Sequence, residues 1–251
     1  MARPRLISIV TVVFNRANTI RRAIDSVLSQ DYAHVEYVII DGGSTDGTSL
    51  IVEEYRERID RIICEPDDGL YDALNKGVSA ASGDAIGFLH ADDFFFDARV
   101  VARIAQKFNE HGSDAVYGDL EYVNEQEKVV RKWQAGKYDR DNFSWGWMPP
   151  HPTVYVRREI YERFGGYRTD MGSAADYECM IRLMVKNQIS VGYIPEVLVR
   201  MQTGGQSNVS LKARLIANGN DQKAWTENGL RPPFGLRFTK PLSKIPQYLF
   251  R

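Results

Sequence analysis

The amino-acid sequence predicts an α/β protein with a mostly parallel central sheet that is flanked by helices. Over residues 6–112, short apolar runs rich in β-branched residues alternate with stretches of helical periodicity. Strands that are separated by single helices form βαβ units with parallel pairing and right-handed crossovers. The chain has 251 residues, 43% of them hydrophobic, which is enough for one large domain or two small ones.

The first strand and the first helix establish this pattern. Residues 6–14 are continuously apolar, as in a strand that helices cover on both faces. Arg3 and Arg5 precede this run as in a secretory signal, but no small-residue cleavage site follows, so we interpret it as a buried strand. A helical stripe comes next, with Asn18 or Thr19 as its N-cap; its apolar members are Ile20, Ala23, Ile24, Val27 and Leu28.

The later elements continue this alternation up to about residue 112. We predict strands at 35–40, 61–64 and 85–89, and helices around 50–55, 70–81 and 100–108. The second half is predicted to contain short extended pieces at 115–117, 121–124 and 128–133, an aromatic loop at 143–147, a helix capped by Ser173 that runs to about Lys186, and a strand at 189–194. We therefore predict one domain over 1–227, with an α/β half over about 1–112 and a smaller α+β half over about 113–227, followed by a basic C-terminal helical tail at 228–251.

Charge and cysteine content exclude several classes of protein. Lys and Arg number 32 against 33 Asp and Glu, so the net charge of −1 provides no field that would hold nucleic acid. Cys64 and Cys179 form no CxxC pair, which argues against a disulfide framework or a thiolate zinc site and favours the cytoplasm. No run approaches the ~20 apolar residues of a membrane-spanning helix. The tail carries five cations and no acid, so it either lies on an anionic membrane surface or forms a basic helix or a disordered end.

Polar loops follow the first four predicted strands, at residues 11–16, 41–44, 65–69 and 90–93. Ligands of open α/β sheets bind at the carboxyl ends of the strands, so these loops are expected to share one crevice. The sequence lacks a GxG dinucleotide fingerprint, and the GxxxxG spacing from Gly42 to Gly47 is not followed by the lysine of a P-loop.

A diphosphate bound here would therefore need another source of positive charge, and a divalent cation held by Asp92 and Asp93 would supply it. The alternative is that these two acids only favour the start of a helix.

Five segments in order resemble glycosyltransferase family 2, the inverting GT-A enzymes that build bacterial surface polysaccharides. They are TVVFNR at 11–16, DGGSTDGT at 41–48, EPDDGLYDALNKG at 65–77, GD at 83–84 and LHADD at 89–93, and the third resembles the subgroup with a YDAxNKG motif. The resemblance covers about residues 5–205. It implies a GT-A fold, which is Rossmann-like, with a nucleotide-sugar half before about residue 112 and an acceptor half after it.

The resemblance also implies which residues bind the nucleotide sugar. Thr11, Phe14 and Asn15 would line the nucleotide pocket with Gly43, and Asp41 would accept a hydrogen bond from the base. Asp72, Asn75 and Lys76 would face the donor from one helix end, although a solvated helix surface is the alternative.

The metal pair implied by the resemblance is Asp92 and Asp93, with Mn²⁺ or Mg²⁺ as the cation and Asp92 also on the ribose. His90 stands where a strict DxD motif has its first Asp, so the motif leaves open which of the two acids ligates the metal.

The acceptor side would contain the catalytic base. The segment SAADYE at 173–178 resembles the family element that carries this base, here Asp176, with Glu178 as the weaker candidate. The helix dipole at this position would favour an ionised carboxylate, but an acid at a helix start can also have no further role. Weaker candidates on the acceptor or diphosphate side are His151, Trp147 and Gly205, for which the alternatives are a structural histidine, a tryptophan that plugs the core edge and a linker glycine.

The sequence thus predicts a hexosyltransferase that moves a sugar from a nucleotide diphosphate, by default UDP, to a hydroxyl of a lipid-linked or growing cell-surface glycan. The tail suggests a peripheral position at the inner face of the cell membrane. Two alternatives are a nucleotidyltransferase that makes activated sugars and a non-catalytic carbohydrate-binding protein. The first would carry a Gly-rich loop after its first strand, yet residues 11–17 contain no glycine.

Overall fold

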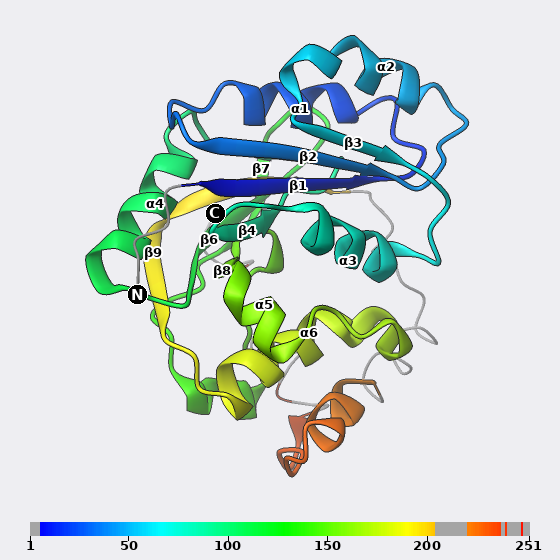
Figure 1. Ribbon diagram of the computed structural model, residues 1–251. Coiled ribbons are helices and arrows are strands. Elements are labelled where there is room, and N and C mark those ends of the chain that lie inside the picture. Colours follow the sequence, from blue (N-terminus) through cyan, green and yellow to red (C-terminus); the bar gives the residue numbers. More distant parts are fainter. Residues whose placement is uncertain (1–5, 204–219, 237–238, 240–246, 248–251) are drawn as a thin grey trace.

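The computed structural model describes residues 6–203, 220–236, 239 and 247, and its centre is one nine-stranded sheet (Figure 1). The strand order is β3-β2-β1-β4-β8-β6-β9-β5, and β7 pairs with β6. Strands β1 to β4 are mutually parallel, as predicted, whereas β8, β5 and β7 join their neighbours antiparallel. The strands are β1 Ile7–Val13, β2 Val35–Asp41, β3 Arg61–Cys64, β4 Ala85–Phe88, β5 Asp93–Phe95, β6 Ala115–Val123, β7 Val129–Trp133, β8 Tyr155–Arg157 and β9 Val191–Gln202.

Helices cover both faces of this sheet. The α-helices are α1 Ile20–Leu28, α2 Thr48–Glu54, α3 Leu70–Ala80, α4 Val100–His111, α5 Arg158–Phe164 and α6 Ala175–Met180. Side chains of β1 alternate between the faces: Ile7 and Ile9 pack with α1, α2 and α4, whereas Val10 and Val12 pack with α3, α5 and α6. Every residue of β1 is buried, which explains its continuously apolar sequence.

The strands differ from the sequence prediction in three places. Residues 115–123 form one strand rather than two pieces, and its register shifts near Gly118, where a Cβ would lie 2.6 Å from Leu198 Cγ. The strand predicted at 189–194 continues to Gln202 because β6 offers a long parallel edge. Strand β5 was not expected, since it has only three residues and its partner β9 is remote in sequence.

The helix predicted from Ser173 begins later. Ser173 lies in the 3₁₀ turn Thr169–Ala174, where Gly172 has a positive φ of 51° and interrupts the helical path. α6 therefore starts at Ala175 and has no side-chain cap, and the chain continues as a π-helical turn over Ile181–Lys186. The predicted inward residues Tyr177, Met180, Ile181 and Met184 are all buried.

The C-terminal segment packs against α6 (Figure 1). Residues 220–227 form a helix, and Trp225 Nε1 donates a 3.2 Å hydrogen bond to the Tyr177 hydroxyl. Asn228 and Leu236 are also buried, so packed residues continue beyond the boundary that we predicted at residue 227. Most of the remaining tail lies outside the described residues.

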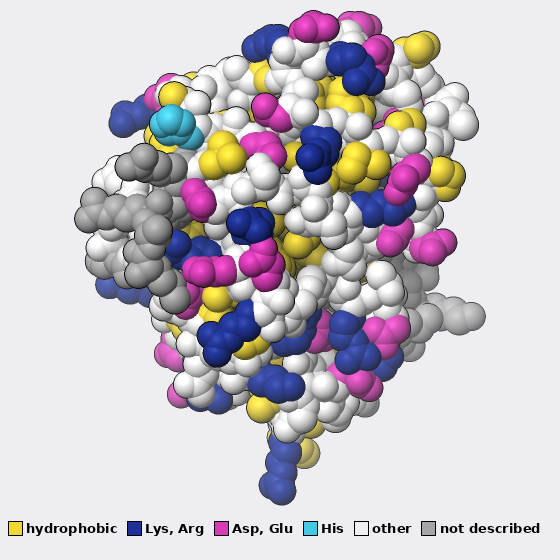
Figure 2. Space-filling view, in the orientation of Figure 1, with side chains coloured by type: hydrophobic (Ala, Val, Ile, Leu, Met, Phe, Trp, Pro, Cys, Tyr) yellow, Lys and Arg dark blue, Asp and Glu magenta, His cyan; other side chains and the backbone are white. Residues whose placement is uncertain are grey.

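Charged side chains of both signs are interspersed over the face that Figure 2 shows, as the net charge of −1 suggests. In the described part of the chain, none of the helices combines the length and the apolar character that crossing a membrane requires.

Candidate functional site

The loops after β1 and β2 are joined directly to each other. Gly42 N donates to Val13 O at 2.9 Å, and Asn15, which has a positive φ of 52°, connects the two loops. Its backbone N donates to Ser44 Oγ at 2.9 Å, and its side-chain Oδ1 accepts from Thr45 N at the same distance. This turn leaves Phe14 with 54% of its surface exposed at the end of β1.

Two residues expected in the nucleotide pocket have buried side chains. Thr11 is fully buried and its hydroxyl shares a 3.1 Å hydrogen bond with the Tyr37 hydroxyl, so its expected place in the pocket stays a prediction. Asp41 is 1% exposed and accepts hydrogen bonds from Ser44 N and the Ser49 hydroxyl. Its carboxylate therefore shapes the loop after β2 and leaves no free face for a base.

The end of β4 brings together the carboxylates that the sequence placed in two different halves. Loss of hydration is the main reason that the pKa of His90 falls to about 4, and the neighbouring His151 lowers it further. The carboxylates of Asp92 and Asp176 act in the opposite direction and raise it, so both lie near His90. Asp176 also raises the pKa of Tyr71, after the larger effect of burial. Asp92 and Asp176 thus both lie close enough to act on the His90 imidazole, and Asp176 also acts on Tyr71.

Asp92 and Asp93 differ sharply in their surroundings. Asp92 precedes β5 and is partly exposed, whereas Asp93 is the first residue of β5 and is fully buried. Neither carboxyl oxygen of Asp93 has a hydrogen-bond partner within the described residues, and burial raises its pKa well above the usual range. Burial disfavours the ionised form of Asp93, so this arrangement favours Asp92 as the metal ligand of the pair, and the expected role of Asp93 stays a prediction.

The divalent cation that the fold family implies fits this donor set. The described residues contain no group of three His, Cys, Asp or Glu side chains that would enclose a metal alone. Mg²⁺ and Mn²⁺ bound together with a substrate diphosphate need only one or two carboxylates and keep several waters. Asp92, partly exposed at the end of β4, provides such a carboxylate.

Two of the three weaker candidates on the acceptor or diphosphate side have structural contacts. His151 is 8% exposed, and its Nε2 shares a 2.8 Å hydrogen bond with the Tyr167 hydroxyl. Trp147 donates from Nε1 to Ala135 O at 2.9 Å and packs edge-on against Phe143, which places it at the core edge. Gly205 lies outside the described residues.

Glu178, the weaker candidate for the base, is 1% exposed and belongs to a buried ion pair. It accepts from Arg182 Nε at 3.0 Å and from Asn228 Nδ2 at 3.1 Å. Arg182 also donates to the backbone carbonyls of Phe164, Gly165 and Gly166. Glu178 thus helps to fix the turn after α5, which favours Asp176 over Glu178 as the base.

The YDAxNKG motif on α3 holds two loops in place. Lys76 Nζ donates to Pro66 O at 2.7 Å and pairs with Glu65 at 3.1 Å, so it fixes the loop after β3. Asp72 Oδ2 accepts from Asp68 N at 3.1 Å in the same loop.

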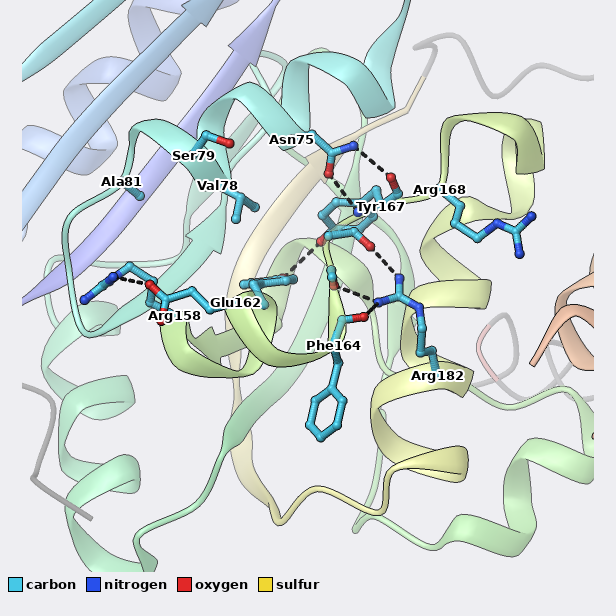
Figure 3. A pocket seen from close by; sticks show the side chains of 13 residues that line it. Asn75, Val78, Ser79, Ala81, Arg158, Glu162, Phe164, Tyr167, Arg168 and Arg182 are labelled. Carbon is cyan, nitrogen blue, oxygen red and sulfur yellow. Dashed lines mark hydrogen bonds and ion pairs between the residues drawn. The ribbon is translucent and has the colours of Figure 1, made fainter. Parts of the chain in front are cut away.

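Asn75 faces the other way, toward the turn after α5. It donates to Tyr167 O at 2.8 Å and accepts from Tyr167 N at 2.7 Å (Figure 3). A cavity of about 640 Å³ lies beside this contact between α3 and α5, and neither Asp92 nor Asp176 lines it. The amide of Asn75 therefore has a structural role, and its expected contact with the donor stays a prediction.

The Asp67 side chain lies near the strand ends, although the sequence indicated only that it belongs to a polar loop. Asp67, in the loop after β3, is partly buried, and its carboxylate rests against Gly42. The Gly42-Gly43 pair could have indicated this contact from the sequence, because adjacent glycines permit close approach by another segment.

Comparisons with known proteins identify the family of this chain. The glycosyl transferase family 2 model matches residues 8–187. A PGL/p-HBAD biosynthesis glycosyltransferase of Mycobacterium tuberculosis is 32% identical over 225 residues, which are 86% of this chain and 84% of that protein. An uncharacterized glycosyltransferase of the same species is 30% identical over 192 residues, 70% of this chain and 68% of the other.

Solved structures share the fold. Staphylococcus aureus TarS superposes with a TM-score of 0.68 at 16% identity over 86% of this chain, which spans only 39% of that protein. TarS 1-349 with UDP-GlcNAc gives 0.66 at 17% identity, covering 97% of this chain and 78% of the other. The mannosyltransferase PcManGT of Pyrobaculum calidifontis, solved with GDP-Man and Mn²⁺, gives 0.66 at 20% identity, covering 95% and 69%.

The family match extends from β1 to the end of the helical segment that carries Asp176, so it includes both carboxylates that meet at His90. This membership favours glycosyl transfer over a nucleotidyltransferase or a non-catalytic binding protein. The chain belongs to glycosyl transferase family 2 and is a glycosyltransferase.

Proposed function

We propose that this glycosyltransferase moves a sugar from UDP to a hydroxyl of a lipid-linked or growing cell-surface glycan, with inversion at the anomeric carbon. One observation carries the proposal: Asp92 and Asp176, from opposite halves of the chain, both act on the imidazole of His90. A donor anchored through its diphosphate near Asp92 would thus present its sugar toward Asp176.

The proposed chemistry is a single displacement. Asp176 removes the proton from the acceptor hydroxyl, whose oxygen attacks the anomeric carbon while the nucleoside diphosphate leaves from the opposite face. The carboxylate is fixed for this task, since its Oδ1 accepts a 2.8 Å hydrogen bond from Tyr177 N. Asp92 would hold a divalent cation, which supplies neutralisation of the charge on the leaving diphosphate.

Uridine is the proposed nucleoside because TarS 1-349 was solved with UDP-GlcNAc, and Mn²⁺ is the first cation to test because PcManGT was solved with it. The lipid-linked acceptor is proposed from the tail, whose cations and apolar residues suit an anionic membrane surface. We accordingly place the reaction at the cytoplasmic face of the cell membrane.

The test combines calorimetry with a transfer assay. UDP-sugars are titrated with and without Mn²⁺ into the wild type, Asp92→Asn and Asp176→Asn, and UDP release is followed with a panel of hydroxyl acceptors. We expect Mn²⁺-dependent binding that Asp92→Asn loses. Asp176→Asn should bind the donor normally but release UDP about 10²–10⁴-fold more slowly, the usual contribution of a general base.

Asp31→Asn is the matched control, because Asp31 is an exposed acid between α1 and β2, away from the carboxyl ends of the strands. Binding that needs no metal, or no binding by any nucleotide sugar, would overturn the proposed metal role. A fully active Asp176→Asn enzyme would overturn the assignment of the base.

A further inference from the structure

The loop after β3 fits against the bare backbone of Gly42. A Cβ built on Gly42 would lie 2.2 Å from Asp67 Oδ2 and 3.1 Å from its Cγ. The Asp67 carboxylate therefore occupies the volume that a side chain at position 42 would fill. Gly43 extends this contact, since its own Cβ would lie 3.7 Å from Pro66 N.

The Asp67 carboxylate is fixed through one oxygen and leaves the other available. Oδ1 accepts from Gly69 N at 2.9 Å, whereas Oδ2 accepts no hydrogen bond from the residues that the structure describes. The 2.7 Å bond from Lys76 Nζ to Pro66 O holds the preceding backbone against α3. Asp67 is thus a preorganised hydrogen-bond acceptor with one unused oxygen.

The location of this acceptor is the end of the first two strands. Gly42 N bonds to Val13 O, so the loop that Asp67 touches begins beside Phe14, whose aromatic ring is exposed. The neighbouring carboxylate of Asp41 is buried and already accepts two short-range hydrogen bonds, so it cannot serve as the acceptor here.

We infer that Asp67 recognises the base of the donor nucleotide by accepting a hydrogen bond from a ring N–H. The inference rests on the proposed function, which supplies a nucleotide at these strand ends. Uracil presents a single N–H at N3, which matches the single unused oxygen of Asp67. Guanine presents two adjacent donors and would leave one poorly paired. Cytosine and adenine have a bare acceptor nitrogen at this ring position and donate only through an exocyclic amino group, so they lack the ring N–H.

The inference is tested by nucleotide selectivity, with UDP and CDP as probes in the presence of Mn²⁺. Calorimetry of Asp67→Asn should show UDP binding weakened about 10–100-fold, the range expected for a hydrogen bond to a charged group. CDP binding should stay the same or improve, since an amide can donate to the cytosine ring nitrogen. Asp68→Asn, an exposed acid of the same loop, should keep the wild-type ratio of UDP to CDP affinity.

A second variant moves the carboxylate without changing it. Gly42 has no positive φ, so Gly42→Ala is compatible with the backbone, but its methyl group must displace Asp67. We expect this variant also to lose selectivity for UDP over CDP, with thermal melting used to confirm that both variants are folded.

Equal weakening of UDP and CDP in Asp67→Asn would overturn the inference, because it would show that Asp67 only shapes the loop. An unchanged ratio of UDP to CDP affinity in Asp67→Asn would overturn it as well. Metal-dependent UDP binding by the wild type would in that case still support the proposed function. Failure of the wild type to bind any nucleotide would overturn the proposed function and this inference together.

Discussion

Strand pairing gives Asp92 and Asp93 different environments although they are adjacent in the chain. Asp93 is drawn into β5 opposite Met201 of β9, and Asp92 stays at the strand end. We expect Asp93→Asn to keep Mn²⁺-dependent donor binding within about threefold of the wild type, because Asn replaces a carboxyl that burial already holds toward its neutral form. A manganese titration measures this, and loss of metal binding in Asp93→Asn would contradict it.

Glu178 is expected to matter for stability rather than for catalysis. Glu178→Gln should lower the free energy of unfolding by about 3 kcal/mol, because it leaves the largely buried guanidinium of Arg182 without its counter-charge. Glu162→Gln is the matched control, since the Arg158–Glu162 pair lies on the surface and should change stability by less than about 0.5 kcal/mol. Urea denaturation of both variants makes the comparison, and equal losses would contradict a special role for the buried pair.

At the residue scale, the sequence predicted which carboxylates lie near each other but not which polar residues are buried. Asp92 and Asp176 lie in segments that resemble those of the family, and both lie near His90 in the structure. The burial of Thr11 depends on a hydroxyl partner, Tyr37, that only the sheet register places opposite it. Local patterns do not reveal such partners, because an exposed polar residue and a buried one with a distant partner look alike in sequence.

The YDAxNKG motif on α3 is expected to stabilise the fold through the loops that its side chains hold. Asn75→Ala should lower the free energy of unfolding by about 2–4 kcal/mol, because it leaves the backbone N–H and C=O of Tyr167 without partners. Asn109→Ala, an exposed asparagine on α4, should cost little and is the control. The outcome that would contradict this expectation is a similar midpoint of urea denaturation for the wild type and both variants.

Elements of the first half were predictable because each strand and helix is a short, periodic run bounded by a polar turn. β3 was predicted with its observed bounds at 61–64, and α3 ended one residue early. In the second half, long-range pairing decides the structure: β6 runs through Gly118 only because β9 passes close beside it. A three-residue strand such as β5 has no local signature, since its only support is a partner about a hundred residues away.

At the scale of the whole molecule, buried histidines make stability depend on pH. Burial lowers the pKa of His151 to about 4, whereas an unfolded chain would protonate it near pH 6.5. Between these values the unfolded state binds more protons, so stability falls as the pH is lowered. We expect His151 to contribute about 2 kcal/mol of this loss between pH 7 and pH 5.

The measurement is the free energy of unfolding at both pH values for the wild type, His151→Gln and His34→Gln. Asp93, whose pKa is raised by burial, acts in the opposite direction, but it does so equally in all three proteins. His34 is exposed and serves as the control. If His151→Gln lost as much stability on acidification as the wild type, the buried imidazole would not be the cause.

Because α3 anchors the loop after β3 through Lys76 and the turn after α5 through Asn75, the two sides of the enzyme share one mechanical support. Chimaeras made with relatives must respect that linkage. If the loop after β3 alone were replaced by that of a relative, its contact with Lys76 of α3 would be lost. If α3 alone were replaced, its hydrogen bonds to Tyr167 would be lost. Residues 65–77 and 166–168 therefore form the smallest set that can be exchanged together without losing these contacts.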